Sequence, residues 1–311
     1  MPIYNLEKRR PKILLLGNGI LRCAKNSVKW YDFLKENAVS EELASVFLYN
    51  EDGKELSEIP NTVLALLLCG VDDKSRKNKY NETLDNHKIY DDENVQMLIS
   101  MFLSLKFDAI LTTNYTYEIE SVINSAYPEK SENGKRKFAK YYSHDPKYLI
   151  HTFNRVAADS PPIWHIHGEQ RRKSSIILSH DEYARLTQKI IEHINKIGNG
   201  YAFDFNCFNV KSWVDYFIIA DIYIVGFGFD YSEFDLWWLL NRRLREKNAK
   251  TGRIVFYDVG NSIPDYKTLA LQQCNVECRN LGFNKPGIDY NDFYSSVFED
   301  IKRELTENPE E

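Results

Sequence analysis

Short, mostly apolar runs recur along the chain, and most of them end in glycine or in small polar residues. Runs that do not alternate between apolar and polar positions are typical of strands buried on both faces, as in a parallel sheet. The pattern therefore predicts buried strands at residues 12–16, 107–114, 163–168, 222–226 and 253–258, and a shorter strand at 175–178.

Between these runs, apolar residues recur at the spacing of an amphipathic helix. This spacing predicts helices at residues 27–48, divided near Asn37, and at 93–105, 181–197, 234–245 and 293–305. Strands that alternate with helices along a whole chain are typical of a doubly wound α/β fold with a Rossmann-like parallel sheet. We expect that fold here.

The length of the chain allows one large core with a smaller module attached to it. We expect a single domain over residues 1–311, with helical insertions at about 20–105 and 118–160 that form the smaller module. The charged run at 72–79 is interpreted as an exposed loop, and the polar, basic stretch at 131–140 as a loop or a small insertion.

Composition narrows the class of protein. Hydrophobic residues make up 43% of the chain and charged residues 27%, which is typical of a soluble globular protein. The net charge of −5 gives no overall attraction to a polyanion, so nucleic acid is not an expected direct partner. No stretch approaches the roughly 20 apolar residues that a membrane-spanning helix needs. The first ten residues lack the apolar core of a signal peptide.

The cysteines argue against both a disulfide framework and a zinc site. Their number is odd and they are spread along the chain, so a reducing, cytoplasmic location is expected. Cys274 and Cys278 are four residues apart and could meet on one helical turn, but no second pair and no nearby histidine completes a tetrahedral site. We expect no bound metal.

The chemistry should lie where the predicted strands end. In a doubly wound sheet, ligands bind outside the carboxyl ends of the strands. Four unusual clusters follow predicted strands, namely Gly17-Asn18-Gly19-Ile20, Thr112-Thr113-Asn114-Tyr115-Thr116, His165-Ile166-His167-Gly168-Glu169 and Gly226-Phe227-Gly228-Phe229-Asp230.

The first of these clusters is open to two interpretations. A glycine-x-glycine turn after a strand lets backbone N–H groups approach a pyrophosphate. Gly17 and Gly19 fit that role, but the third glycine of the common dinucleotide fingerprint is missing. An ordinary strand-to-helix turn explains the same residues.

Two residue types in the other clusters suit bond cleavage at a ribose. The amide of Asn114 both donates and accepts hydrogen bonds, so it can hold a ribose hydroxyl and a water molecule together. A histidine titrates near neutral pH and can serve as a general base. Alternation along a strand places His165 and His167 on the same face, so either of them can be the catalytic one. They could also be a metal pair, but no third ligand follows at a recognisable spacing.

Together the clusters resemble the sirtuin-like superfamily, in the order and roughly the spacing of its core motifs, from about Lys12 to Asp258. The resemblance implies that Gly17, Asn18, Gly19 and Ile20 hold the diphosphate of NAD, and that Asn114, with Thr113 before it, meets the nicotinamide ribose and the attacking water. It also implies that His167, which precedes a glycine, faces the ribose. Further nucleotide contacts fall on Gly226, Phe227 and Gly228, and Asp258 approaches the adenosine.

Departures from the family pattern indicate a branch of it. The two cysteine pairs that hold zinc in protein-deacylating sirtuins have no counterpart, and Thr116 stands where an acidic residue is expected. The chain is more similar to zinc-free members found in bacterial antiphage defence, which deplete NAD. Gly17-Asn18-Gly19 and residues 165–169 also resemble a related group of abortive-infection proteins.

Three functions compete at this stage. The first is an NAD hydrolase that acts as an abortive-infection effector and gives nicotinamide and ADP-ribose. The second is an NAD-dependent protein deacylase, and the third is a non-catalytic nucleotide-sensing subunit of a defence complex. The presence of both Asn114 and His167 argues against the third. A lethal hydrolase needs control, so the resemblance implies a homo-oligomer or a regulatory partner protein, in which the helix around Trp237 is a candidate contact.

Overall fold

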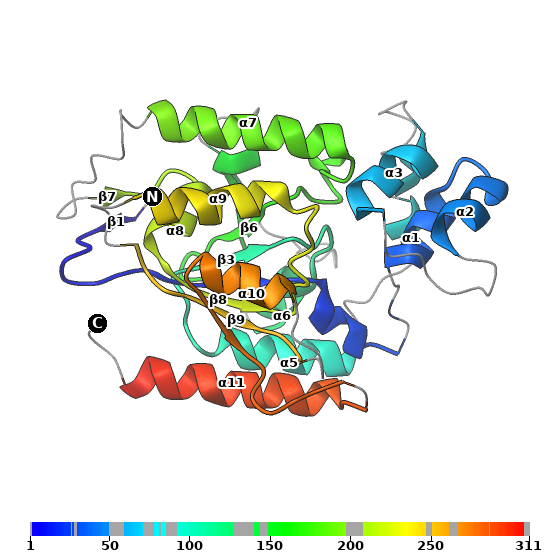
Figure 1. Ribbon diagram of the computed structural model, residues 1–311. Coiled ribbons are helices and arrows are strands. Elements are labelled where there is room, and N and C mark those ends of the chain that lie inside the picture. The colour runs from blue at the N-terminus through cyan, green and yellow to red at the C-terminus, as the bar shows by residue number, and fades with distance from the viewer. Residues whose placement is uncertain are drawn as a thin grey trace, which may run out of the picture.

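An eight-stranded, mostly parallel sheet forms the centre of the molecule in the computed structural model (Figure 1). Its order is β10-β9-β8-β2-β3-β6-β5-β4, and the predicted α/β class is confirmed. The parallel strands are β2 (Lys12–Leu16), β3 (Ala109–Thr112), β6 (Ile163–His165), β8 (Asp221–Val225), β9 (Ile254–Tyr257) and β10 (Val276–Arg279). The antiparallel strands β5 (Thr152–Arg155) and β4 (Lys140–Ser143) extend the sheet at one edge.

The structure describes most of the chain, with gaps. The described residues are 2–25, 27, 30–49, 59–70, 78–80, 82–84, 92–126, 140–143, 149–196, 208–246, 251–260, 266–285 and 287–307. The predicted loop at 72–79 lies almost entirely outside them, as do most of the segment 131–140 and Cys207.

The order of the parallel strands identifies the type of sheet. Numbered along the chain, the six strands lie in the order 3-2-1-4-5-6, which is that of dinucleotide-binding Rossmann folds. The order reverses between β2 and β8, and ligands of such sheets bind at the carboxyl side of that switch point. The fold therefore marks a binding edge independently of any motif.

Alternate residues of the central strands supply two separate cores. Ile13 and Leu15 of β2 point into one core, and Leu14 and Leu16 point into the other. This is why β2 is apolar at every position after Lys12 and does not alternate. Helices cover both faces, as a doubly wound sheet requires.

Figure 1 shows α7 and α9 on one side of the sheet and α5 and α11 on the other. The first face carries α7 (His180–Lys196), α8 (Trp213–Ile219), α9 (Phe234–Arg245) and α10 (Tyr266–Gln273). The second carries the 3₁₀ helix η1 (Asn18–Cys23), α5 (Glu93–Leu103), α6 (Glu118–Ala126) and α11 (Tyr290–Glu307).

The first insertion forms a small helical module with its own core. It contains α1 (Trp30–Asn37), α2 (Glu41–Leu48) and α3 (Asn61–Cys69), which stand apart at one end of the molecule in Figure 1. Phe33, Leu34, Leu64 and Leu68 are buried in this core. The two predicted helices in 27–48 are confirmed, with their division after Asn37.

Two predictions about the remaining segments are wrong. Residues 175–178 are not a strand: η3 (Lys173–Ser175) is followed by Ile176 and Leu178, whose side chains pack into the helical module. Their apolar character serves that contact and not a sheet. The insertion at 118–160 is not helical throughout, because β4 and β5 follow α6, with the short 3₁₀ helix η2 (Leu149–His151) between them.

Smaller features complete the description. A separate antiparallel pair joins β1 (Ile3–Tyr4) to β7 (Phe208–Asn209). Cys274 follows α10 whereas Cys278 lies on β10, so the two thiols do not share the helical turn that their spacing would allow. In the described part of the chain, no helix combines the length and the apolar character that crossing a membrane requires.

Candidate active site at the carboxyl edge of the sheet

The predicted site residues follow strands that end in one row. In the sheet register Leu16 lies opposite both Thr112 and Val225, Thr112 lies opposite His165, and Val225 lies opposite Tyr257. The glycine turns, Asn114, the two histidines and Asp258 therefore leave neighbouring strands at the same edge. This edge includes the switch point between β2 and β8.

The two glycine turns pack against each other, backbone to backbone. The N–H of Gly17 donates to the carbonyl of Val225 at 2.9 Å, and the N–H of Gly19 donates to that of Gly226 at 2.5 Å. A Cβ on Gly19 would lie 2.6 Å from the Gly226 oxygen, and Gly226 itself has a φ of +66°. Because these two N–H groups already have acceptors, the expectation that both donate to a diphosphate loses its physical basis. The glycines are needed for the packing of the turns.

The other residues predicted to contact the nucleotide differ in whether their side chains are accessible to a ligand. The side chains of Ile20 and Phe227 are buried in the core, so only their backbone can face a ligand. Asn18 is exposed and Thr113 is half-buried. A Cβ on Gly228 would meet no atom within 4 Å, so its turn is open.

Lys267, which was not predicted as a site residue, links two of the predicted nucleotide contacts, Gly228 and Asp258. The Lys267 ammonium donates to the Gly228 carbonyl at 2.7 Å and lies 3.3 Å from the Asp258 carboxylate. Gly228 and Asp258 are therefore brought together at the β8–β9 end of the row.

Asn114 is held in place by hydrogen bonds of its backbone, whereas its side-chain amide oxygen makes none with the described residues. Its N–H donates to the Thr112 hydroxyl at 3.1 Å, and its carbonyl lies 2.6 Å from Nδ1 of His165. The side chain is 6% exposed, and Oδ1 has no hydrogen-bond partner among the described residues. A buried amide oxygen without a partner is costly, so it is a natural acceptor for a ligand hydroxyl or a water molecule.

His165 is engaged at both ring nitrogens. Nδ1 faces the Asn114 carbonyl, and Nε2 lies 2.9 Å from the carboxylate of Glu120 on α6. Burial alone would lower the pKa of His165, but the Glu120 carboxylate raises it to about 9. The ring is therefore a buried imidazolium that donates to both acceptors. Asn154 donates to Glu120 as well, at 2.9 Å.

His167 contacts different elements from His165, so the expected shared strand face is wrong. β6 ends at His165, and a turn follows in which the N–H of Gly168 donates to the His165 carbonyl at 3.0 Å. This turn directs His167 to α7 and α9. Its Nε2 lies 3.1 Å from Asp235 Oδ2, and its Nδ1 lies 3.3 Å from the Tyr183 hydroxyl.

Acidic groups set the protonation of His167. Burial alone would lower the pKa of His167, but the carboxylates of Asp235 and Glu233 raise it above its ordinary value. Glu233, which precedes α9, lies 3.6 Å from Nδ1 and accepts a hydrogen bond of 2.7 Å from the Tyr183 hydroxyl. Burial raises the pKa of Glu233 to about 7, against the opposing pull of His167.

The sequence itself matches a known family over this region. The family model of the SIR2-like domain matches residues 108–277, which include Asn114, both histidines and Asp258. The chain belongs to the SIR2-like domain family. SIR2-like domains take NAD as a substrate, so this is a family of NAD-utilising enzymes. No curated protein matches the chain.

One group of three side chains within the described part of this SIR2-like domain is close enough to be considered for a metal ion. It consists of His167, Glu233 and Asp235, whose candidate ligand atoms lie within 4.8 Å of one another. The two carboxylates, however, lie next to different nitrogens of the ring. A metal ion binds only one of these nitrogens, so the arrangement fits a hydrogen-bonded imidazole better.

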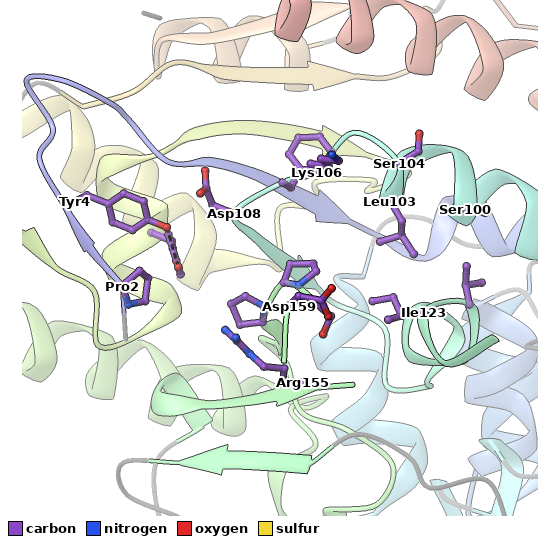
Figure 2. Close-up of a pocket in the computed structure, with 16 residues that line it drawn as sticks. Pro2, Tyr4, Ser100, Leu103, Ser104, Lys106, Asp108, Ile123, Arg155 and Asp159 are labelled. Carbon is purple, nitrogen blue, oxygen red and sulfur yellow. Dashed lines mark hydrogen bonds between the residues drawn. The ribbon is translucent and has the colours of Figure 1, made fainter. Parts of the chain in front are cut away.

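A large cavity lies at the opposite edge of the sheet. It has a volume of about 980 Å³, and Asp108 and Pro162, which precede β3 and β6, are among its lining residues. Figure 2 shows Tyr4, Lys106 and Arg155 in its wall. Because ligands of doubly wound sheets bind at the carboxyl edge, this cavity is not the NAD site that the fold indicates.

Proposed function

We propose that this SIR2-like domain hydrolyses NAD at the nicotinamide–ribose bond and releases nicotinamide and ADP-ribose. Cleavage of this bond passes through an oxocarbenium-like state, so the enzyme must fix the ribose and place a water molecule. In this proposal Asn114 holds a ribose hydroxyl and the water, and His167 accepts a proton.

The observation that carries this proposal is the unpartnered amide oxygen of Asn114. It is buried at the end of β3, next to the switch point, and its backbone is held at both the N–H and the carbonyl. An acceptor that is fixed in place and lacks a partner suits a group that must meet a substrate hydroxyl. Family membership supports NAD as that substrate.

We further propose that the protein is an effector of abortive infection in bacterial antiphage defence. The support is the zinc-free motif pattern, together with the burial of the site: Asn114 is 6% exposed and His167 is 2% exposed. For a substrate to reach these groups, the residues that cover the carboxyl edge of the sheet must move apart. This suits an enzyme that stays inactive until an oligomer forms or a partner protein binds, and in this proposal that movement is the regulated step.

The test is the release of nicotinamide from NAD by Asn114→Ala. We expect kcat to fall by about 10²–10⁴-fold, because a positioning contact at the reacting ribose is lost. Asn94→Ala is the matched control: its amide donates to the Cys23 carbonyl and to Asn291, and neither of these is a predicted site residue. Both variants should keep the wild-type melting temperature within a few degrees.

The same assay separates the competing functions. A deacylase would release nicotinamide only when an acylated peptide is added, and a sensor would bind NAD without cleaving it. Full cleavage by Asn114→Ala under conditions in which the wild type is active would overturn the proposed mechanism.

A further inference from the structure

Asn114 and His167 follow two different strands, and a single loop residue is hydrogen-bonded beside each of them. This residue is Ile177, which follows η3. Its N–H donates to the His167 carbonyl at 2.8 Å, and its carbonyl accepts the Tyr115 hydroxyl at 2.7 Å. Tyr115 is the residue directly after Asn114. We call these two hydrogen bonds the Ile177 bridge, and the inference drawn from it rests on the proposed function.

Tyr115 is fixed at its hydroxyl, its carbonyl and its ring. The hydroxyl donates to Ile177, the carbonyl accepts the N–H of Gln170 at 2.8 Å, and the ring packs against the core of the helical module. The peptide group between Asn114 and Tyr115 carries the carbonyl that lies 2.6 Å from Nδ1 of His165. A displacement of Tyr115 therefore turns this peptide group, and the Asn114 side chain turns with it.

The neighbours of Ile177 anchor the bridge in the helical module. Ile176 is 0% exposed and Leu178 is 2% exposed, and both side chains lie in the core of the module. This core is separate from the two cores that cover the sheet. Because Ile177 stands between two anchored residues, its backbone moves only when they move. The bridge therefore connects the helical module to the ends of β3 and β6.

His167 does not depend on the bridge alone for its position. Its Nε2 lies 3.1 Å from Asp235, and its Nδ1 lies 3.3 Å from the Tyr183 hydroxyl, so α9 and α7 hold the ring directly. The Asn114 side chain has no such contact among the described residues, since its Oδ1 is without a partner. Asn114 is therefore the residue whose placement depends on Tyr115.

We propose that Tyr115 is a positioning residue that holds Asn114 in place relative to His167 and ties it to the helical module. A shift of the module moves Ile177, and Asn114 then leaves the position that cleavage at the ribose requires. A misplacement of about 1 Å at a reacting centre can cost on the order of 10²-fold in rate. The regulated movement of the proposed function thus acts where the module meets the sheet.

The hydroxyl of Tyr115 is suited to a lasting hydrogen bond. Burial raises its pKa well above the usual value, and the carboxylates of Glu233 and Glu182 raise it further. The hydroxyl therefore keeps its proton at neutral pH and remains a donor to the Ile177 carbonyl.

The first test removes only this hydroxyl. We expect Tyr115→Phe to lower kcat for nicotinamide release by at least about tenfold with KM within about twofold, because the position of Asn114 is lost and not the binding of NAD. Tyr216→Phe is the matched control: this buried hydroxyl lies 3.4 Å from that of Tyr4, and Tyr216 lines the cavity at the opposite edge of the sheet. Its removal should leave kcat unchanged.

Loss of folding is separated from loss of position by adding sucrose, which favours the folded state. The lowered kcat of Tyr115→Phe should persist in sucrose. Wild-type kcat in this variant, either without sucrose or after its addition, would overturn the positioning role.

A cycle with Asn114→Ala distinguishes positioning from packing. If Tyr115 acts by placing Asn114, Tyr115→Phe should lower the residual kcat of Asn114→Ala by less than about twofold, because the side chain to be placed is gone. A packing defect would instead lower kcat by the same factor in both backgrounds, and that result would overturn the proposal.

The tie to the module is tested at its anchor. Leu178→Ala should lower kcat by at least about threefold in the wild-type background and by less than about 1.5-fold in the Tyr115→Phe background, since both variants break one path. Leu178→Val takes its place if the alanine variant does not fold. Equal factors in the two backgrounds would contradict the tie.

A last measurement needs no turnover. Hydrogen exchange followed by NMR reports how well the Ile177 N–H is held to the His167 carbonyl. The bridge predicts that Tyr115→Phe speeds this exchange by at least about fivefold, whereas Tyr216→Phe leaves it unchanged. Equal exchange in wild type and Tyr115→Phe contradicts the bridge. A wild type that releases no nicotinamide overturns the proposed function instead, and the exchange rate still decides the bridge.

Discussion

His165 is a buried cation directly beneath the proposed catalytic asparagine. Its two N–H groups donate to the Asn114 carbonyl and to Glu120, and Asn154 donates to both Glu120 and Glu169 at 2.9 Å. The network ties the end of β3 to the start of α6. Asn114 is therefore positioned by an ion pair that takes no part in the proposed chemistry.

This ion pair predicts how stability changes with pH. The pKa of His165 is raised from 6.5 to about 9 on folding, so its contribution to stability is fully present below about pH 6.5 and is lost as the pH rises through 9. We expect the free energy of unfolding in urea to fall between pH 7 and pH 9.5 in the wild type. Glu120→Gln should make that decline smaller, because the carboxylate that raises the pKa of His165 is gone.

Glu192→Gln is the control for this measurement. Glu192 is exposed, and its carboxylate accepts a hydrogen bond of 3.1 Å from the Gln188 amide on the same helix, so this variant should keep the wild-type decline. An unchanged decline in Glu120→Gln would contradict the assignment.

Two strand-to-helix turns, after β2 and after β8, are the elements that shape the switch point. They touch through backbone atoms, and the carbonyl of Gly226 accepts the N–H of Gly19. A side chain on either glycine would force the turns apart. The fold therefore needs glycine at these positions whether or not a ligand binds there.

Alanine substitutions test the contact as a requirement of the fold. Gly19→Ala should destabilise the protein by about 1–3 kcal/mol, since overpacking costs that much and its Cβ would lie 2.6 Å from a carbonyl oxygen. Gly228→Ala should change stability by less than about 0.5 kcal/mol, because its Cβ meets no atom within 4 Å. Thermal and urea unfolding measure both. Equal losses of stability would contradict the contact as described.

Elements with strong apolar patterns were predictable from sequence, and those with weak patterns were not. The sequence predicts α9 at its observed bounds and β8 within one residue. β10 was missed because Val276 is the only residue of the strand that is fully buried. β4 and β5 pair antiparallel at the edge of the sheet, where an unbroken apolar run is not required.

The site was predictable in part for a similar reason. Asn114 and His167 follow strong strands, and strand ends converge in any parallel sheet. The carboxylates that contact the two histidines come from helices: Glu120 lies 45 residues before His165, and Asp235 lies 68 residues after His167. No short spacing signals such pairs. One available signal was Asp235 itself, a carboxylate at the start of an apolar helix face with no exposed surface.

At the scale of the whole molecule, the structure bears on whether a metal ion is needed. Within the described residues, the only group of three candidate metal ligands is His167, Glu233 and Asp235, and its two carboxylates lie at different nitrogens of the His167 ring. We therefore expect a chelator such as EDTA to leave both the melting temperature and nicotinamide release unchanged. Stoichiometric metal in the purified protein, lost together with activity on chelation, would contradict this prediction.

The position of β2 has a consequence for how the protein is made. β2 is the first strand of the main sheet to be synthesised, yet it lies between β3 and β8, and β8 ends at Val225. At about 5–20 residues per second, on the order of 10–40 s pass on the ribosome between the two strands. During that interval the nascent chain holds an apolar strand with one edge unpaired, a target for chaperones and for aggregation. β2 is therefore the oldest strand of the main sheet, and its second edge stays unpaired until β8 has been made.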